Sequence, residues 1–406
     1  MQQLLISVLK RFLFPILIVG ALFGCVSAPP PSPPAKPGEA PTVPSIPTIP
    51  SPPRTGLPPD ATPLGAPIVQ VKSRWSPVRW AELPGWGEDQ LHEAWNAWLK
   101  SCERSTTALA SLCPEVRRLS IANANEQMAW MMERLQPYKV EPLAPVTPAN
   151  GSAGNVDGLL TAYYEPIFVG SRNPSASFSV PMYRPPATLG TRKPWFSRQE
   201  MDTLPEARAA LHGRAIVYLA DPVDALVLQI QGSGRVRVTE PDGSQKTVRI
   251  AYAATNDQPY KSVGRWLLDQ GAIKDASWPG IKAWIAANPK RVQEMLWSNP
   301  RVVFFKEEPL PEQDASLGPK GAQGVALTPG RSIAVDAGSI PYGAPVWLVS
   351  NGPQTQLQRL VLAQDTGSAI VGAVRADYFT GWGNEAGELA GRIKQPLKLW
   401  VLWPKP

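Results

Sequence analysis

The sequence around residue 370 reads Leu360-Val-Leu-Ala-Gln-Asp365-Thr-Gly-Ser-Ala-Ile-Val-Gly-Ala-Val-Arg375-Ala-Asp377-Tyr-Phe379. Both aspartates stand inside or at the end of apolar runs that are typical of buried strands. A third aspartate, Asp336, follows the similar run Ile333-Ala-Val. A carboxyl group in apolar surroundings loses solvation, which raises its pKa and suits it to donate a proton near neutral pH. The three aspartates are therefore candidates for a general acid; the alternative is that they cap turns by accepting backbone N–H bonds.

The composition leaves few other sources of chemistry. The 406 residues include only two histidines and three cysteines, which argues against a zinc site and leaves little material for a Ser/His or Cys/His catalytic pair. We therefore expect a reaction that depends on carboxylates, with no metal and no cofactor. The net charge of +7 comes without a block of Lys or Arg, so it predicts attraction to an acidic partner rather than nucleic-acid binding.

The tripeptide Asp365-Thr-Gly also matches the short signature of aspartic proteases. That chemistry requires two such carboxylates that share a proton, whereas the sequence holds a single Asp-Thr-Gly. A protease would therefore have to be a symmetric dimer, which is the alternative that this tripeptide leaves open.

Short apolar runs between turn residues predict a β-rich body of two domains in a chain of this length. Two segments with helical spacing, 87–101 and 114–136, predict helices ahead of it. Strand-like runs of a barrel or small sandwich follow at 158–166, 178–183, 215–219, 225–231, 235–238 and 246–250, the last two joined by a hairpin turn at 241–244. Helices are predicted at 262–270, 278–287 and 289–296, and strands at 302–305, 333–335, 346–349, 357–364 and 397–403.

The N-terminus has the pattern of a secretory leader. Lys10 and Arg11 precede an apolar stretch that ends at Gly24 and is too short to span a membrane comfortably. Cys25 follows at the position where bacterial lipoproteins are cleaved and acylated, with plain secretion as the alternative. Sixteen prolines stand among residues 29–67, so residues 25–67 are expected to form an extended tether.

These features predict a periplasmic protein that is lipid-anchored to the outer membrane of a Gram-negative bacterium, a compartment in which disulfides form. Cys102 and Cys113 would lie ~16 Å apart on one straight helix. A disulfide between them therefore requires a turn in the chain, and two free thiols are the alternative.

Six motifs, the three-aspartate region among them, occur in order along the body of the chain. They are Gly158-Leu-Leu-Thr-Ala-Tyr-Tyr-Glu-Pro, Val180-Pro-Met-Tyr-Arg-Pro-Pro186, Gln229-Ile-Gln-Gly-Ser-Gly234, Tyr260-Lys-Ser-Val-Gly264, Asn299-Pro-Arg-Val-Val-Phe-Phe-Lys306 and the three-aspartate region through Gly383-Asn-Glu-Ala-Gly387. Together they resemble the membrane-bound lytic transglycosylase A (MltA) family, periplasmic lipoproteins that cut the glycan of bacterial peptidoglycan. The resemblance covers roughly residue 158 to the C-terminus, and residues 68–157 match only loosely.

The resemblance implies a mainly β fold with flanking helices and two β-domains. A double-psi β-barrel, the three-aspartate (3D) domain, would be assembled from residues 68–165 and 327–406. A smaller β-barrel would be inserted between these segments as residues 166–326. The glycan would lie in the groove where the two domains meet, and residues 1–24 would be the signal peptide ahead of the tether.

The resemblance also implies roles for single residues. Asp377 takes the place of the catalytic acid, with Asp365 and Asp336 as supporting carboxylates. The substrate-binding positions that line the groove fall on Thr161, Tyr163, Gln231, Ser233 and Gly234.

The implied reaction is a lytic transglycosylation that needs one acid. Asp377 would protonate the oxygen of the β-1,4 bond between N-acetylmuramic acid and N-acetylglucosamine and then accept the proton of the muramyl C6 hydroxyl, which attacks its own C1 to give a 1,6-anhydro product. An internal nucleophile requires neither water nor a second carboxylate. The alternatives are a hydrolytic muramidase, with Asp365 as the second carboxylate, and a non-catalytic peptidoglycan-binding lipoprotein. Glycan strands and the outer membrane are the expected partners, with cell-wall synthases or scaffold proteins as further candidates.

Overall fold

The computed structural model describes residues 63–105, 108–143, 158–311, 314–353 and 355–405. The predicted leader, Cys25 and the tether up to residue 62 lie outside these residues. Within the described part of the chain, no helix has both the length and the apolar character needed to cross a membrane.

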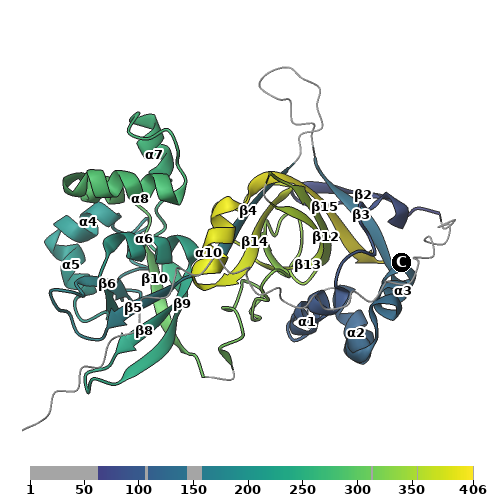
Figure 1. Cartoon of the computed structure of the whole chain (residues 1–406), viewed down its shortest axis with the longest axis horizontal. Coiled ribbons are helices and arrows are strands. Elements are labelled where there is room, and N and C mark those ends of the chain that lie inside the picture. Colours follow the sequence, from purple (N-terminus) through teal and green to yellow (C-terminus); the bar gives the residue numbers. More distant parts are fainter. Residues whose placement is uncertain (1–62, 106–107, 144–157, 312–313, 354, 406) are drawn as a thin grey trace, which may run out of the picture. The chain divides into compact units, whose positions relative to one another are not determined.

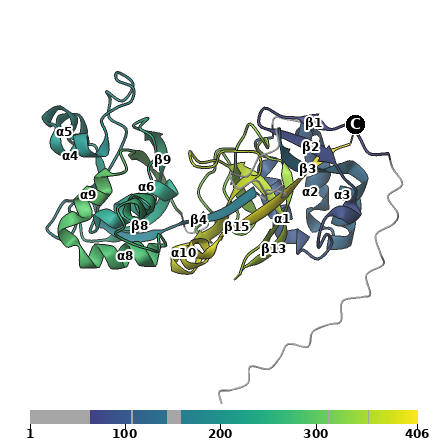
Figure 2. The ribbon, with the colours of Figure 1, turned by 90° about the horizontal axis from the view of Figure 1, so that it is seen from above.

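The first sheet closes on itself. Its nine strands follow the order β1-β2-β3-β15-β12-β13-β11-β14-β4, and β4 pairs in addition with β15, so six strands form a ring (Figures 1 and 2). Two pairs in the ring are parallel, β11 with β13 and β14 with β4, in agreement with the double-psi barrel that the resemblance implies. The strands are β1 (Ile68–Val69), β2 (Ser73–Pro77), β3 (Leu135–Pro142), β4 (Gly158–Glu165), β11 (Ser332–Val335), β12 (Pro345–Asn351), β13 (Gln356–Asp365), β14 (Arg375–Trp382) and β15 (Lys394–Pro404).

The long strand β15 closes the ring because it changes neighbours along its length. On one edge it pairs with β12. On the other edge Lys394–Leu397 pairs with β4, and Trp400–Pro404 pairs with β3. The N-terminal strands β1 to β3 therefore extend the sheet outside the barrel.

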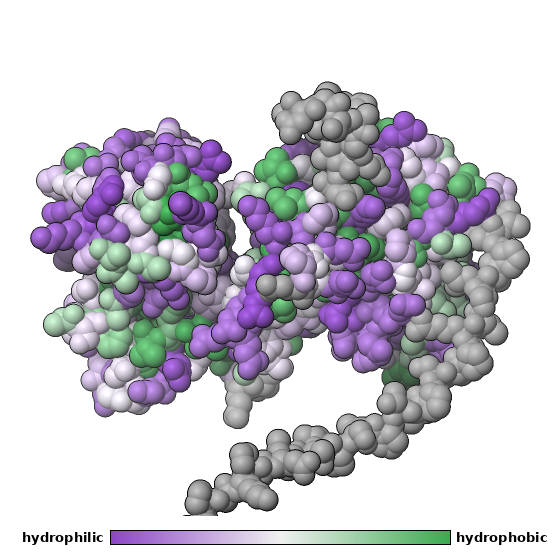
Figure 3. All heavy atoms as spheres, turned by 45° about the horizontal axis from the view of Figure 1, so that its top comes forward, coloured by the Kyte–Doolittle hydropathy of each residue, from purple (hydrophilic) through white to green (hydrophobic). Residues whose placement is uncertain are grey.

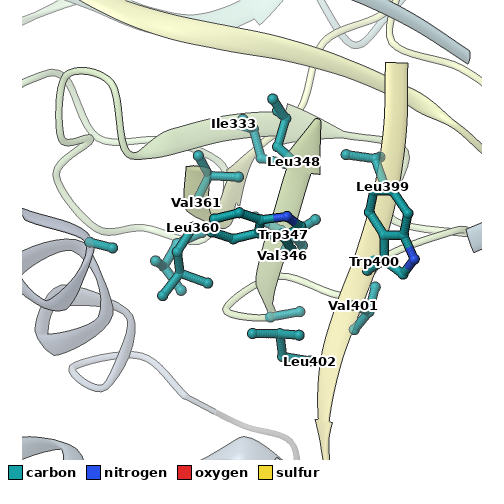
Figure 4. Close-up of a cluster of buried hydrophobic side chains, with 14 of the residues drawn as sticks. Ile333, Val346, Trp347, Leu348, Leu360, Val361, Leu399, Trp400, Val401 and Leu402 are labelled. Carbon is teal, nitrogen blue, oxygen red and sulfur yellow. The ribbon is translucent and has the colours of Figure 1, made fainter. Parts of the chain in front are cut away.

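Apolar side chains from both faces of the central strands form the main core (Figure 4). Strand β12 is buried on both faces from Pro345 to Ser350, which explains why its sequence is an apolar run without alternation. Trp347 is fully buried, and its Nε1 donates to the carbonyl of Pro84 at 3.0 Å. Burying a side chain the size of valine or leucine stabilises a fold by about 1.5–3 kcal/mol.

Helices cover this core on one side of the barrel. They are η1 (Trp80–Glu82), α1 (Leu91–Ser101), η2 (Ala108–Leu112), α2 (Cys113–Arg118), η3 (Leu119–Ile121) and α3 (Ala124–Arg134). The helix predicted over 114–136 is thus divided between α2, η3 and α3, and its last residues belong to β3. Cys102 follows α1 and Cys113 begins α2, so the chain turns between them and the two residues form a disulfide.

The second sheet carries the strands that follow β4. Its order is β10-β9-β8-β5-β7-β6, with one parallel pair, β5 with β8. The edge strands β6 and β10 contact each other, so the sheet curls towards a barrel. The predicted hairpin turn at 241–244 joins β8 to β9, as expected. The strands are β5 (Ile167–Ser171), β6 (Val180–Tyr183), β7 (Ala215–Leu219), β8 (Ser233–Thr239), β9 (Gln245–Thr255) and β10 (Val303–Pro309).

Helices connect and cover these strands. They are α4 (Arg198–Thr203), α5 (Pro205–Leu211), α6 (Pro222–Gln231), α7 (Val263–Asp269), α8 (Trp278–Ala287), η4 (Pro289–Arg291) and α9 (Val292–Trp297), and α10 (Gly383–Arg392) follows β14 in the first sheet. On the face shown in Figure 3, hydrophobic residues form small groups among hydrophilic ones.

The strand predicted at 225–231 is wrong, because these residues form helix α6. The helix begins with Asp221, whose carboxylate accepts the N–H of Val223 at 2.8 Å, and has Pro222 in its first turn. It ends at Gly232, which has a positive φ of 79°. An apolar run of this length fits a buried helix and a buried strand equally well.

The chain passes from the first sheet to the second between Glu165, at the end of β4, and Ile167, at the start of β5. It returns to the first sheet at β11. The strands therefore divide as the implied two-domain fold requires, while the boundaries at residues 166 and 327 and the groove stay predictions.

Candidate active site

Three of the predicted site residues lie in one row across four strands of the barrel. Asp377 on β14 is in register with Thr161 on β4 and with Ala334 on β11. Ala334 is in register on its other side with Asp365 at the end of β13. Side chains of registered residues point to the same face of a sheet, so the two acids flank one small alanine.

The side chains of this row point away from the main core, because side chains alternate between the two faces along each strand. Leu160 and Ala162 on β4, like Ala376 and Tyr378 on β14, belong to the apolar core of the barrel. Because successive side chains of a strand point to opposite faces, Thr161 and Asp377 point to the other side. Asp365 and Asp377 are both half-buried, a position that removes part of their solvation while leaving them accessible.

Asp377 is held by a hydroxyl group and faces a cation. The Thr161 hydroxyl donates a hydrogen bond to Asp377 Oδ1. Arg375 Nη2 in turn donates to Thr161 Oγ1 at 2.8 Å. Burial raises the pKa of Asp377 above its ordinary value, although the hydrogen bond from Thr161 and the charge of Arg375 oppose the shift. The group is thus biased towards its protonated form.

Asp365 accepts hydrogen bonds from a phenol and from the backbone. Tyr163 donates its phenol proton to Asp365 Oδ2 at 2.8 Å, and the N–H of Ala322 donates to Oδ1 at 2.9 Å. Burial and, to a smaller extent, the charge of Asp377 raise the pKa of Asp365 to about 6 against these hydrogen bonds. The titration of Asp365 therefore depends in part on the charge of Asp377.

Asp336 lies in a different environment. Its carboxylate accepts a hydrogen bond from Lys72 at 2.8 Å and from the backbone N–H groups of Gly372 and Gly338 at 2.9 and 3.0 Å. Burial alone would raise the pKa of Asp336, but the hydrogen bonds from Lys72 and the two glycines lower it below its ordinary value. Asp336 therefore stays charged and ties the loop before β14 to the end of β11.

The other predicted binding residues have structural contacts. Gln231 Oε1 accepts the N–H of Tyr164 at 3.0 Å, which links α6 to the strand that carries Thr161 and Tyr163. Ser233 is buried, and a Cβ placed on Gly234 would lie 2.5 Å from Leu228 Cδ1. The described contacts do not bring Ser233 or Gly234 to the carboxylates.

Two groups at the site were missed in the sequence. Arg375 stands two residues before Asp377 and on the same face of β14, so the period of the strand was the signal that would have found it. The backbone N–H of Ala322 comes from the linker before β11 and carries no sequence signal. The remaining predicted residue, Cys25, lies outside the described part of the chain.

These residues place a carboxyl group with a raised pKa beside a hydroxyl group and a guanidinium group. Within the described ranges, no group of three or more His, Cys, Asp or Glu side chains is placed to hold a metal ion. A protonated carboxyl group beside a hydroxyl and a guanidinium can give up a proton and leave a stabilised carboxylate. A carboxyl group in such surroundings is typical of an enzyme that works by general acid–base catalysis.

Comparison with known proteins gives the family. The MltA specific insert domain matches residues 159–306, and the 3D domain matches residues 331–403. The membrane-bound lytic murein transglycosylase A of Escherichia coli K12 is 33% identical over 288 residues, which are 68% of this chain and 70% of that protein. The Vibrio cholerae protein of the same name is 31% identical over 261 residues, 61% of this chain and 66% of the relative.

Solved structures agree with this assignment. The lytic transglycosylase LtgG of Burkholderia pseudomallei is 40% identical, with a TM-score of 0.54, and the match covers 85% of this chain and 98% of that one. MltA from Neisseria gonorrhoeae is 30% identical, with a TM-score of 0.67, over 84% of this chain and 96% of that one. The chain belongs to the MltA family of membrane-bound lytic murein transglycosylases.

Proposed function

We propose that this chain cleaves peptidoglycan glycan strands as a lytic transglycosylase, with Asp377 as the single acid and base. Two things support the proposal: membership of the family, and the raised pKa of an accessible carboxyl group beside Thr161 and Arg375. The solved E. coli MltA carries bound chitohexaose. A glycan strand is the corresponding ligand for this chain.

The reaction uses the neighbours of Asp377 in turn. Protonated Asp377 donates to the oxygen of the β-1,4 bond, and the bond to C1 of the muramyl residue breaks as positive charge develops on that sugar. The new carboxylate is stabilised by the Thr161 hydroxyl and the Arg375 charge. It then accepts the proton of the muramyl C6 hydroxyl while that oxygen bonds to C1, so the product is a 1,6-anhydro sugar and Asp377 regains its proton.

Asp365 supports this reaction in two ways, through its own charge and through its hydrogen bond with Tyr163. Burial and the neighbouring Asp365 carboxylate raise the pKa of Tyr163 far above its ordinary value, so the phenol keeps its proton and continues to donate. Any negative charge on Asp365 makes ionisation of Asp377 less favourable. Asp336 acts as a structural residue in this proposal, and Gln231, Ser233 and Gly234 shape the strand and helix beside the site.

The product distinguishes the lyase from a muramidase. We expect purified sacculi treated with the full-length chain to release muropeptides with anhydro ends, which are one water lighter than reducing ends by mass spectrometry. Reducing ends alone would assign hydrolysis, with Asp365 as second carboxylate. Binding without release would leave a peptidoglycan-binding protein, and cleavage of a peptide substrate would favour the protease.

The location of the protein in the cell depends on the N-terminal residues, which lie outside the described part of the chain. We propose that Cys25 is lipidated and anchors the chain to the outer membrane, with residues 25–67 as a tether in the periplasm. The relatives are named membrane-bound. A Cys25→Ala protein should leave the membrane fraction on cell fractionation, and its retention there would contradict the anchor.

A further inference from the structure

A fully buried ion cluster lies where the chain passes from the first sheet to the second. Glu165, the last residue of β4, has a side chain with 0% exposure. Its carboxylate accepts from Arg235 Nε at 2.8 Å and from Arg249 Nε at 2.6 Å. The two arginines are in register on β8 and β9 and are themselves buried.

The same arginines also hold a third part of the chain. Arg235 donates to the carbonyl of Ala315 at 2.7 Å and to that of Leu317 at 3.0 Å. Arg249 donates to the Leu317 carbonyl as well, at 2.7 Å. Ala315 and Leu317 belong to the linker that leads back to the first sheet, and the ring of Trp382, in register with Glu165, covers Arg235 at 4.3 Å.

The linker continues directly to the acid pair. A Cβ on Gly318 would lie 2.8 Å from the ring of Phe379, and a Cβ on Gly321 would lie 3.2 Å from Asp365 Cβ. Both glycines thus allow the backbone to pack against Phe379 and Asp365, which any larger residue would displace. The next residue, Ala322, donates its N–H to Asp365. One run of residues therefore joins the ion cluster to the carboxyl pair.

We propose that Glu165, Arg235 and Arg249 form a positioning cluster, which fixes the linker 315–322 and through it the geometry of Asp365 and Phe379 beside Asp377. None of the three touches the reacting groups. A carboxylate buried between two guanidinium groups has a narrow range of acceptable geometries, so it can fix the positions of the segments that contribute to it. This role rests on the proposed function, since it is a role in that reaction.

Arg249→Lys is the sharpest test. Lysine keeps the charge but lacks the planar fork of donors, so it cannot bind Glu165 and the Leu317 carbonyl together in the native geometry. We expect the turnover number on sacculi to fall about 10- to 100-fold, as misplacement of a site by about 1 Å does, with KM nearly unchanged. Loss of the Ala322 hydrogen bond should also move the titration of the acid pair, and with it the pH–rate profile, to higher pH.

A second measurement is independent of activity. Hydrogen exchange of the peptide that contains residues 315–322, read by mass spectrometry on the full-length chain, should be faster in Arg249→Lys than in the wild type. Glu165→Gln should show the same changes, and if it does not fold, Arg249→Lys carries the test alone. If the wild type releases no cleaved muropeptides, the proposed function fails while the exchange result still decides whether the cluster fixes the linker.

Arg172→Lys is the matched control. Arg172 pairs with Glu240 at 3.2 Å and with Glu307 at 2.7 Å on the same sheet, and no described contact joins it to the linker. It should leave both turnover and exchange at the wild-type level. The proposal is overturned if Arg249→Lys keeps wild-type exchange, if it exchanges faster with unchanged turnover, or if Arg172→Lys causes the same losses.

Discussion

At the scale of the residue, the three aspartates of the barrel have the same type of side chain but differ in their surroundings. Asp336 accepts from a lysine and two backbone N–H groups and is held in its charged form. Asp365 and Asp377 lose solvation that the hydrogen bonds they accept do not offset, and their pKa values rise. The environment, and not the residue type, therefore separates a structural carboxylate from carboxyl groups suited to proton transfer.

Replacement of Asp377 tests the acid directly. Asp377→Asn keeps the shape of the side chain but carries no transferable proton, so turnover of sacculi should fall at least about 100-fold. Binding to sacculi in a pull-down assay should be retained. Asp336→Asn is the comparison: it should lower the free energy of unfolding while the folded fraction keeps its activity. Undiminished release of muropeptides by Asp377→Asn would refute the assignment.

The pKa of Asp365 makes a prediction for stability against pH. Its value of about 6 in the folded chain exceeds the ordinary value of about 3.9, so the folded state binds the proton more tightly than the unfolded state. The stability that this gives is present at low pH and is lost as pH rises through about 6. Relative to Asp365→Asn, the wild type should lose up to about 3 kcal/mol between pH 4 and pH 8.

Urea unfolding of both proteins at pH 4 and pH 8 measures this change. Comparing two pH values cancels any constant cost of the substitution, such as a hydrogen bond that asparagine cannot accept. A difference between the proteins that stays the same at both pH values would show that the carboxyl group has an ordinary pKa in the folded state.

The residues of the site were partly predictable from the sequence. Asp365 and Asp377 stand in apolar runs, so their burial could be predicted before the structure. Their pairing across Ala334 depends on the register of three strands, which no local pattern specifies. Glu165 lies 70 and 84 residues from its arginine partners, and the sequence gives no sign that they meet.

At the scale of the element, α6 illustrates how a local signal can be overlooked. Its apolar run taken alone predicts a strand, although Asp221-Pro222 at the start and Gly232 at the end are boundary residues of a helix. The capping groups, rather than the apolar residues between them, distinguish the two structures here. The consequence is functional, because Gln231 at the end of α6 binds the backbone of β4.

Gly232→Ala tests the end of this helix. Gly232 has a φ of +79°, and a Cβ at this position would meet nothing within 4 Å. The cost should therefore come from the backbone alone, about 1 kcal/mol, and appear as a small decrease in the midpoint of urea unfolding. Gly391→Ala, within helix α10 and likewise in open space, should instead be neutral or stabilising. Equal effects of the two substitutions would contradict this explanation.

At the scale of the whole molecule, the barrel is closed by segments that are distant in the chain. Strands β4 and β15 pair although the whole second sheet lies between them in sequence. Such closure orders a long stretch of chain before its contacts form. The chain segments before and after the second sheet both contribute side chains to the main core. The row of registered residues that contains Asp377 therefore forms only when this core is intact.

The disulfide between Cys102 and Cys113 contributes to this core from the helical side. Both cysteines are buried beside α1, which packs on β13, the strand that ends at Asp365. A cross-link over 11 residues restricts the unfolded chain, and its removal should cost about 3 kcal/mol. We expect a Cys102→Ser/Cys113→Ser protein to unfold at a lower urea concentration than the oxidised wild type. Its urea midpoint should be close to that of the wild type under reducing conditions.

The activity of the folded protein should not depend on this disulfide. Since neither cysteine contacts Asp365 or Asp377 in the described structure, the folded fraction should release muropeptides at the wild-type rate. A double variant that is as stable as the oxidised wild type would show that the bond does not stabilise the fold, and lost activity in a folded double variant would mean that the helices position β13 for catalysis.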